Sequence, residues 1–422
     1  MYRLAIFASI VLAGPTLVVA QSPSDSCTKC HLALESEKAG PAQKFATDVH
    51  HDVGLSCADC HGGDPHEESM EAMSPAKGFR GAPKKPQIPQ FCARCHSDTT
   101  FMHRFDPRVR VDQLSQYLTS VHGKRLKQGD TKVAACVDCH GVHDILRVSD
   151  TRSPVYPMNV ATTCAHCHAD AEHMKGYGIP TDQVENYEKS VHAQMLAQGD
   201  TSAPTCTTCH GNHGATPPGV RSVVNVCGTC HVFFEQLFNN SPHRPVFAAM
   251  GLPGCVQCHS NHAVVKPSDD WVGTGPNSVC MGCHAEGDKG FEASRKIAGD
   301  LAKLQTELAR AGETLSTAEH SGMEVSTPKV GLTNANEALV KARVNVHTFN
   351  EADVRKFTDQ GVEISQKAYQ AGVAALHERD ARRKGLGVSL IFIVLTISGL
   401  YLKIRLMESR PSPSSGPQAS GE

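Results

Sequence analysis

The chain has 422 residues and a formal net charge of −2, and 40% of its residues are hydrophobic but only 5% aromatic. It contains 18 cysteines and 24 histidines, and every cysteine belongs to one recurring motif. This exhaustive use of cysteine excludes structural disulfides and a catalytic thiol.

The N-terminus has the features of a secretory signal peptide. Arg3 precedes an apolar run over residues 4–19, and Val18-Val19-Ala20 resembles a small-residue cleavage site before Gln21. This order is typical of a signal sequence, and a cysteine motif follows too closely for a spanning helix. We predict that residues 1–20 are removed and that the mature chain lies outside the cytoplasm.

Cys-x-x-Cys-His occurs nine times. The cysteines are Cys27, Cys30, Cys57, Cys60, Cys92, Cys95, Cys136, Cys139, Cys164, Cys167, Cys206, Cys209, Cys227, Cys230, Cys255, Cys258, Cys280 and Cys283. The histidines that follow are His31, His61, His96, His140, His168, His210, His231, His259 and His284. In c-type haem attachment the two thiols bind the porphyrin and the histidine ligates the iron. A redox dithiol or half of a zinc site would explain one copy, but neither requires nine copies with a histidine.

Nine covalently attached haem c groups leave little polypeptide for each. The motif region, from Cys27 to His284, provides about 29 residues per haem, too few for an ordinary apolar core around each cofactor. We therefore expect the porphyrins to form the core of a domain over residues 21–285, mainly α with little regular secondary structure.

One motif stands alone and the other eight form four two-haem repeats. In two copies, Ser120-Val-His122 and Ser190-Val-His192 lie at the same distance before Cys-x-x-Cys-His-Gly-x-His, and a further motif follows. Looser copies begin at Ser241-Pro-His243 and near His50. Such internal repetition indicates a repeated structural unit.

Histidines at repeated positions are candidates for the distal face of an iron. They are His50 (or its neighbour His51), His66, His122, His143, His192, His213, His243 and His262. A histidine three residues after its proximal ligand cannot easily reach around its own porphyrin, so we expect it to ligate a neighbouring haem. The alternative for any one of them is a surface histidine bonded to a propionate.

The ninth distal ligand is open. We hypothesise that His347 supplies it to a haem of the main domain, since it shares a helical stripe with Val340 and Val344. A satisfied core histidine is the alternative. His103, His166 and His173 are rivals, and Met102 or Met174 would give a His/Met haem.

Residues 286–385 change to a helical composition. Leu301, Leu304, Leu308 and Leu315 mark a first amphipathic helix that ends near Gly322. We expect a second from Thr333 or Asn334 to about His347, and a third from Asn350 toward Arg383 with a joint at Gly385 and Gly387. These helices form a stalk or hairpin.

Residues 386–407 are expected to form one transmembrane helix. Leu386–Leu402 carries no charge over seventeen residues, and Lys403 and Arg405 can snorkel. A buried core helix is the alternative. Since the haem motifs must be extracytoplasmic, residues 408–422 become a disordered cytoplasmic tail.

Haem also changes the charge. With eighteen propionates and nine ferric centres the net charge becomes about −11 when oxidised. The basic run Lys84, Lys85, Arg104, Arg108 and Arg110 then compensates propionates, and we expect no nucleic-acid partner.

With these motifs in view, the chain resembles the multihaem c-type cytochromes of bacterial periplasms, including membrane-anchored quinol dehydrogenase cytochromes and soluble multihaem carriers. The resemblance covers about Cys27 to His284. Those quinol dehydrogenases usually carry their anchor at the N-terminus, whereas the apolar segment here is C-terminal, and we assign no quinol site. The resemblance implies electron transfer with redox partner proteins.

Enough histidines are present to close every iron on both faces, so we expect an electron-transfer protein rather than an enzyme. It would connect a membrane quinol-oxidising or b-type cytochrome partner with periplasmic acceptors, and no small-molecule substrate is expected. A terminal reductase of nitrite, hydroxylamine or a sulfur oxyanion, with one open haem, is the alternative. The sequence leaves open the reduction potentials, the direction of electron flow and the oligomeric state.

Overall fold

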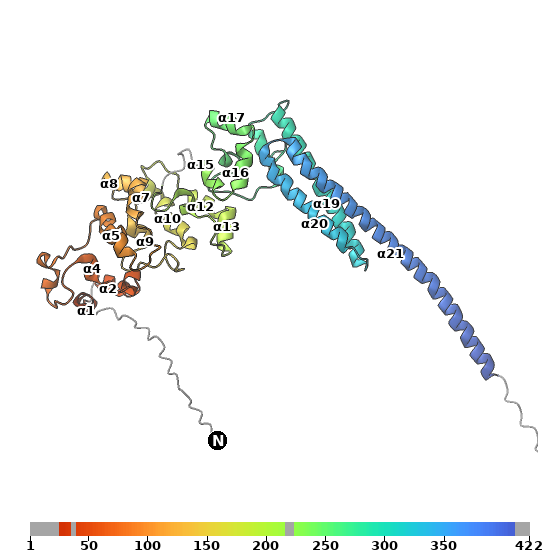
Figure 1. The fold of residues 1–422 in the computed structure, drawn as a ribbon, viewed down its shortest axis with the longest axis horizontal. Coiled ribbons are helices and arrows are strands. Elements are labelled where there is room, and N and C mark those ends of the chain that lie inside the picture. Colours follow the sequence, from red (N-terminus) through yellow and green to blue (C-terminus); the bar gives the residue numbers. More distant parts are fainter. Residues whose placement is uncertain (1–24, 35–38, 216–222, 410–422) are drawn as a thin grey trace, which may run out of the picture. The chain divides into compact units, whose positions relative to one another are not determined.

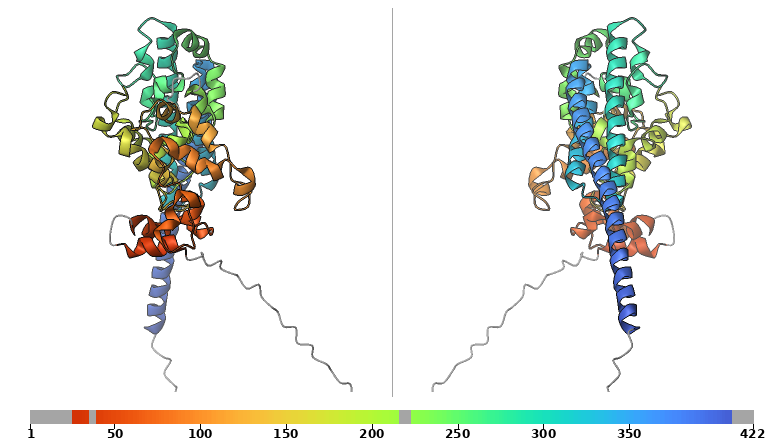
Figure 2. Two further views of the ribbon diagram at one scale, coloured as in Figure 1. Left: turned by 90° about the vertical axis from the view of Figure 1, so that its left-hand side faces the viewer. Right: turned by 90° about the vertical axis from the view of Figure 1, so that its right-hand side faces the viewer.

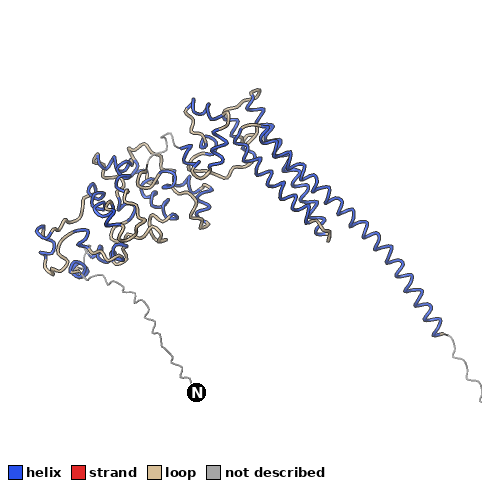
Figure 3. Tube along the Cα trace, in the orientation of Figure 1, coloured by secondary structure: helices blue, strands red, loops and turns tan. Residues whose placement is uncertain are grey.

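The computed structural model describes residues 25–34, 39–215 and 223–409. Within these ranges the regular elements are α-helices and 3₁₀ helices, with no strand (Figure 3). The expected mainly α fold is therefore confirmed. The predicted signal peptide and residues 410–422 of the predicted tail lie outside the described residues.

The chain divides into two compact units, which are described separately. The first consists of residues 1–227 and 255–266, and the second of residues 228–254 and 267–422. The expected boundary between a haem domain and a stalk near residue 285 stays a prediction. Figure 1 labels the helices along the sequence.

Short helices joined by loops make up the first unit. They are α1 (Ser26–Ala33), α2 (Ala39–Phe45), α3 (Val49–Asp52), α4 (Cys57–His61), α5 (Ile88–His96), α6 (Thr99–Met102), α7 (Gln113–Thr119), α8 (Val121–Lys127), α9 (Cys136–His140), α10 (Val160–His168), α11 (Ala171–Met174), α12 (Gln183–Glu188), α13 (Val191–Ala197), α14 (Cys206–His210), α18 (Cys255–His259) and the 3₁₀ helices η1 (Met70–Met73), η2 (Pro75–Lys77), η3 (Lys85–Gln87) and η4 (Pro157–Asn159). Helix α15 (Val223–Gly228) ends at the first residue of the second unit. Among the described residues of this unit, one small cluster of buried apolar side chains forms, at Leu126, Val133 and Ala135. A chain with so little apolar core needs another core material, as the haem motifs predict.

The two best-matched repeats are built by the same local contacts. Ser120 and Ser190 are fully buried, and each side chain caps a helix. The Ser120 hydroxyl accepts from Gly123 N at 2.9 Å, and the Ser190 hydroxyl accepts from Ala193 N at 3.1 Å. The Tyr117 hydroxyl donates to Ala134 O at 2.8 Å, and that of Tyr187 donates to Pro204 O at 2.9 Å. Burial raises the pKa of Tyr187 to about 12. The sequence repeat is thus also a structural repeat.

The second unit contains the longest helices. Its elements are α16 (Val232–Asn239), α17 (His243–Met250), η5 (Asp269–Trp271), η6 (Val279–Gly282), α19 (Lys289–His320), α20 (Ser326–Asn345), η7 (Val346–Thr348) and α21 (Glu351–Glu408). Helices α19, α20 and α21 pack side by side (Figure 2). Leu301, Leu304 and Leu315 of α19 are at most 1% exposed. The apolar spacing of the first stalk helix therefore marks its buried face, as expected.

Close packing of α21 on α19 depends on small residues. A Cβ atom at Gly361 would lie 2.7 Å from the methyl groups of Leu304, and one at Gly372 would lie 2.9 Å from Thr314 Cγ2. Asn350 caps α21, because its side chain accepts from Ala352 N at 3.0 Å. The predicted N-cap of the third stalk helix is thus confirmed.

Three details of the stalk differ from expectation. Helix α20 begins at Ser326 rather than near Thr333, because Pro328 lies in its first turn, where a missing amide hydrogen costs nothing. Helix α21 continues through the expected joint at Gly385, since an isolated glycine weakens a helix without ending it. Val340 is 56% exposed, so the inward stripe of α20 runs instead through Ala335, Ala338, Leu339 and Ala342.

The end of α21 is apolar and exposed. In Figure 1 it extends beyond the ends of α19 and α20. Its most apolar stretch has a mean hydropathy of 2.2, and none of that stretch is buried in the protein. The side chains from Leu386 to Met407 are therefore not those of a buried core helix. By length and composition α21 could cross a membrane.

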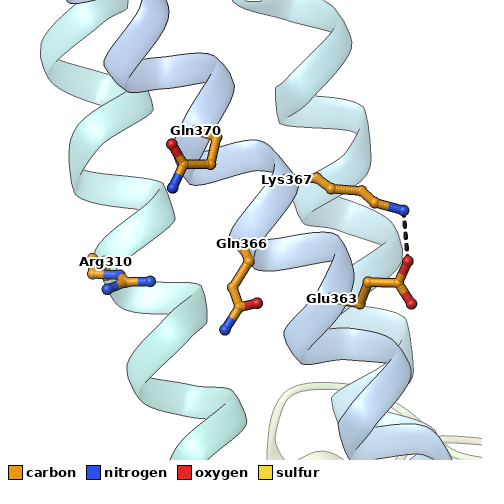
Figure 4. Close-up of a pocket in the computed structure, with 5 residues that line it drawn as sticks. All are labelled: Arg310, Glu363, Gln366, Lys367 and Gln370. Atoms are coloured by element: carbon orange, nitrogen blue, oxygen red, sulfur yellow. Dashed lines mark hydrogen bonds and ion pairs between the residues drawn. The ribbon is translucent and has the colours of Figure 1, made fainter.

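A surface groove on the stalk is polar. It is lined by Arg310 of α19 and by Glu363, Gln366, Lys367 and Gln370 of α21 (Figure 4). Lys367 Nζ and Glu363 Oε1 form an exposed ion pair at 2.6 Å, and Arg310 stacks over Tyr369 at 4.2 Å. The groove is lined by no histidine or cysteine, so it does not belong to the cofactor sites described next.

Candidate haem-binding sites

Four of the attachment motifs form single helical turns. Helices α4, α9, α14 and α18 consist of the five motif residues alone. Residues three apart lie on the same side of a helix, so both thiols face one surface and the histidine follows them. Gly62 and Gly141 end their turns with φ of 71° and 82°, and Ser260 has φ of 64° after α18. Each of these four motifs is therefore preorganised by a short helix with a sharp exit.

The structure brings twelve predicted ligands together as six histidine pairs. The distances between ring centroids are 5.9 Å for His50–His96, 6.0 Å for His61–His143, 6.1 Å for His122–His168, 6.1 Å for His140–His213, 6.0 Å for His210–His262 and 5.9 Å for His243–His284. Each pair joins one motif histidine to one histidine predicted as a distal ligand.

The common separation fits one metal ion between two rings. Imidazole nitrogens bound to a metal at about 2.0 Å on opposite sides place the ring centroids roughly 6 Å apart. Direct stacking of the rings would bring them closer, and a hydrogen bond between them would require no such uniform spacing. The residues present therefore fit haem iron with two histidine ligands.

Two pairing rules emerge from the six pairs. The second motif of a repeat pairs with the leading histidine of the same repeat, as in His122–His168 and His243–His284. The first motif pairs with the histidine that follows the first motif of the next repeat, as in His140–His213. The His61–His143 and His210–His262 pairs obey the same second rule. Successive repeats are thus interlocked.

Backbone hydrogen bonds reinforce this interlocking. Val49 N donates to Ile145 O at 2.7 Å, Val121 N to Ala215 O at 3.2 Å, and Val191 N to Val264 O at 2.9 Å. In each case the donor directly precedes a leading histidine, and the acceptor lies two residues after the distal histidine of the next repeat. The same contact therefore registers each repeat against its successor.

Several ligand rings are oriented through Nδ1. His50 Nδ1 lies 2.8 Å from Asp48 Oδ1, His61 Nδ1 lies 3.0 Å from Gly81 O, and His284 Nδ1 lies 3.3 Å from Asp288 Oδ2. Such contacts fix the tautomer and leave Nε2 for a metal.

Asp48 also accepts from Ile145 N at 2.8 Å and is 1% exposed. Burial alone would raise the pKa of Asp48, but its hydrogen bonds to His50 and Ile145 hold the pKa below the usual value. The leader Asp48-Val49-His50 therefore corresponds to the Ser-Val-His leaders, which assigns the repeated position to His50. The ring of His51 instead packs edge-on against Phe45 at 5.5 Å.

Burial favours the neutral form of these rings. It lowers the pKa of eight paired histidines, which are His96, His122, His140, His143, His168, His213, His243 and His262. A metal binds imidazole only when the ring nitrogen is deprotonated. Burial thus favours the neutral form of the rings, which is the form that binds a metal.

Neighbouring attachment sites follow one another in sequence order. Thr28 Oγ1 lies 3.9 Å from Cys57 Sγ, and Cys60 is close enough to Cys95 to interact electrostatically. Contact with the Cys136 thiol, together with burial, raises the pKa of Cys92.

The series continues through the next repeat. Burial and the nearby charges of Asp138, Cys136 and Cys167 raise the pKa of Cys139. Contact with the Cys206 thiol raises the pKa of Cys164. The first six attachment sites therefore form a continuous series in space.

The remaining candidate ligands are placed as follows. His31 lies in α1, where Ser26 N donates to Pro65 O at 2.8 Å and so brings the loop carrying the exposed His66 alongside. His192 occupies the second position of α13. His231 is the N-cap of α16 and His259 ends α18. His347 lies in η7.

The rival ligands are less well placed. His103 and His166 are exposed, and Met174 is buried at 7% exposure. Sequence reasoning missed Asp48, Asp288 and Gly290, which support ligands without binding haem themselves. Asp48 could have been found by aligning Asp48-Val49-His50 with the leaders that begin at Ser120 and Ser190.

Gly290 is held against a predicted proximal ligand. A Cβ atom there would lie between 2.1 and 2.6 Å from three ring atoms of His284. We expect Gly290→Ala to displace the ring and to weaken one iron–histidine bond, so that one haem gains high-spin character by electron paramagnetic resonance (EPR). Gly299→Ala, in the same helix with no atom near the added methyl group, is the matched control. Equal spectra for the two variants would contradict this role of Gly290.

Comparison with known proteins agrees with these motifs. A family model described as a doubled CXXCH motif matches residues 243–289, the fourth repeat. No curated protein and no solved structure matches the chain. The matched motif pair is the pattern of multihaem c-type cytochromes. Together with the other copies, it indicates that the protein binds haem c covalently and has a general role in electron transfer.

Proposed function

We propose that the protein is a nonahaem c-type cytochrome, anchored to the periplasmic face of a bacterial cytoplasmic membrane, that transfers electrons between a membrane respiratory partner and periplasmic acceptors. The six histidine pairs at about 6 Å carry this proposal. Haem c supplies reversible one-electron chemistry when bound. The chain supplies the ligands, their neutral state and their spatial order.

The pairs favour electron transfer over substrate reduction. Two imidazoles close both faces of an iron and leave no position for nitrite, hydroxylamine or a sulfur oxyanion. His50, His61 and His284 are also fixed through Nδ1, which opposes loss of the ligand. The histidine pairs therefore close these iron sites to substrate, as suits an electron relay.

The order of the attachment sites supports a continuous path. Electron transfer between cofactors falls steeply with distance, so a relay needs close neighbours. Cys92 is close enough to Cys136, and Cys164 to Cys206, for the two side chains of each pair to interact, which brings consecutive repeats together. Because each repeat also provides a ligand to the preceding one, a change in spacing would break the ligand pairs. The interlocking thus maintains the short steps that a relay requires.

The C-terminal helix supports a membrane location for the relay. Its exposed apolar end could anchor the protein in the membrane, next to a quinol-oxidising or b-type cytochrome partner. Arg379, Arg382, Arg383 and Lys384 precede the apolar stretch and can contact lipid head groups. We expect the partner to copurify from membranes solubilised in mild detergent.

Reoxidation kinetics test the proposed function. The purified full-length protein is reduced with dithionite, freed of reductant, and mixed with an oxidised small c-type cytochrome or with nitrite, hydroxylamine or tetrathionate. We expect fast reoxidation by the cytochrome and none by the small molecules on the same timescale. Catalytic consumption of one of the small molecules would instead establish a reductase.

A further inference from the structure

We infer that the stalk ends the haem array as a capping repeat, with His347 as an axial haem ligand presented by the turn between α20 and α21. The inference deepens the proposed function and rests on its haem chemistry. It concerns a segment, His347-Thr348-Phe349, that lies outside all nine attachment motifs and outside the family match.

The segment has the pattern of the distal-ligand segments in the repeats. There the histidine is followed two residues later by an apolar residue, as in His143-Asp-Ile145, His213-Gly-Ala215 and His262-Ala-Val264. The carbonyl of that apolar residue accepts from the residue before a leading histidine of the preceding repeat. His347 and Phe349 have the same spacing.

The leader of the fourth repeat differs from the other leaders, and this difference explains why the stalk contacts it in a different way. Its leader is Ser241-Pro242-His243, and Pro242 occupies the position of Val49, Val121 and Val191. Proline has no amide hydrogen and cannot make the registering hydrogen bond. Instead, the Phe349 ring packs against the His243 ring at 3.9 Å between centroids. A ring contact thus takes the place of the backbone contact.

The turn is built to hold this position. Phe349 has φ of 52°, a left-handed conformation that is uncommon for a bulky residue and that persists only when its surroundings enforce it. Its ring also meets Phe238 edge-on at 6.5 Å, and Phe238 contacts Phe247 at 5.7 Å. An aromatic cluster around His243 therefore fixes the turn of the stalk.

His347 itself has the environment of a ligand. Its Nδ1 lies 2.9 Å from Val344 O, which fixes the tautomer and leaves Nε2 for a metal. Its ring packs edge-on against Phe234 of α16 at 4.9 Å. Burial lowers its pKa, so the ring is neutral at physiological pH. Three of the paired histidines have a comparable Nδ1 contact, and burial lowers the pKa of eight others.

Repeat arrays commonly end in atypical units that cover the last interface. Here the fourth repeat is followed by α19, and Asp288 serves both as the N-cap of that helix and as a contact of His284 Nδ1. The stalk therefore engages the ligands of the last repeat at two places, Asp288 and the turn at 346–349. This gives it a cofactor-binding role besides a spacer role.

The test uses the full-length holoprotein with His347→Ala. We expect about one of the nine haems to become high-spin by EPR, and the reduced variant to bind about one carbon monoxide per chain where the wild type binds almost none. Added imidazole should restore the low-spin spectrum. The matched control is His320→Ala, because His320 also has Nδ1 bonded to a helical carbonyl, that of Ser316, at 2.7 Å. The control should remain low-spin.

If His347→Ala does not accumulate as holoprotein, a second variant tests the same inference. His347→Met offers a thioether to the same iron, and we expect one haem of raised potential with His/Met absorption. Wild-type spectra for both variants would overturn the inference and leave the proposed function intact. High-spin haem already present in the wild type would count against the proposed function instead.

Discussion

Replacing His143 by alanine is expected to open the haem attached through Cys57 and Cys60, rather than the haem attached beside it through Cys136 and Cys139. The reason is that the ring of His143 faces His61 at 6.0 Å, whereas that of His140 faces His213 at 6.1 Å. One haem should become high-spin by EPR in the single variant.

Double variants identify which iron loses its ligand. If His61 and His143 share an iron, His61→Ala/His143→Ala removes one low-spin haem, the same as either single change. His140→Ala/His143→Ala should remove two, because those residues belong to different irons. The number of low-spin haems that are lost is the same whether or not the haem stays attached after loss of its proximal ligand. The reverse pattern would show that His143 serves its own motif and that the repeats are not interlocked.

Removal of residues 386–422 is expected to release the protein from the membrane with its haem spectrum unchanged. The apolar end of α21 is exposed along its length, and it packs on neither α19 nor α20. Insertion of such a helix in lipid is effectively irreversible, so detergent should be needed to extract the full chain and not the shortened one.

The matched control removes only residues 410–422. This variant keeps the whole of α21 and should stay in the membrane fraction. If the intact chain and both shortened variants were released from the membrane to the same extent, the helix would not anchor the protein. Loss of haem from the longer deletion would show instead that the end of α21 stabilises the haem-binding part.

The attachment motifs can be recognised in the sequence because their chemistry is local. Four copies of Cys-x-x-Cys-His each form one helical turn, and the spacing of their residues does not depend on distant packing. The amphipathic spacing of Leu301, Leu304 and Leu308 likewise identified the inner face of α19, since a periodic stripe reports burial directly.

Other features depend on contacts that no local pattern encodes. The pairing of His61 with His143 follows from how repeats stack, which spacing alone left open. The stripe through Val340 was assigned wrongly, because the small residues Ala335 and Ala342 permit close helix packing and turn a different face inward. The steric role of Gly290 arises from the approach of His284 after the chain folds. Such positions have no signature until the packing is known.

The EPR spectrum of the purified, oxidised full-length protein, with spins quantified against its haem content, tests whether every iron is closed on both faces. A chain of closed sites predicts low-spin ferric signals from all nine haems and no change on addition of nitrite or hydroxylamine. A substantial high-spin signal that shifts when either molecule is added would contradict it, because an iron open to substrate is incompatible with a chain of closed, histidine-paired sites.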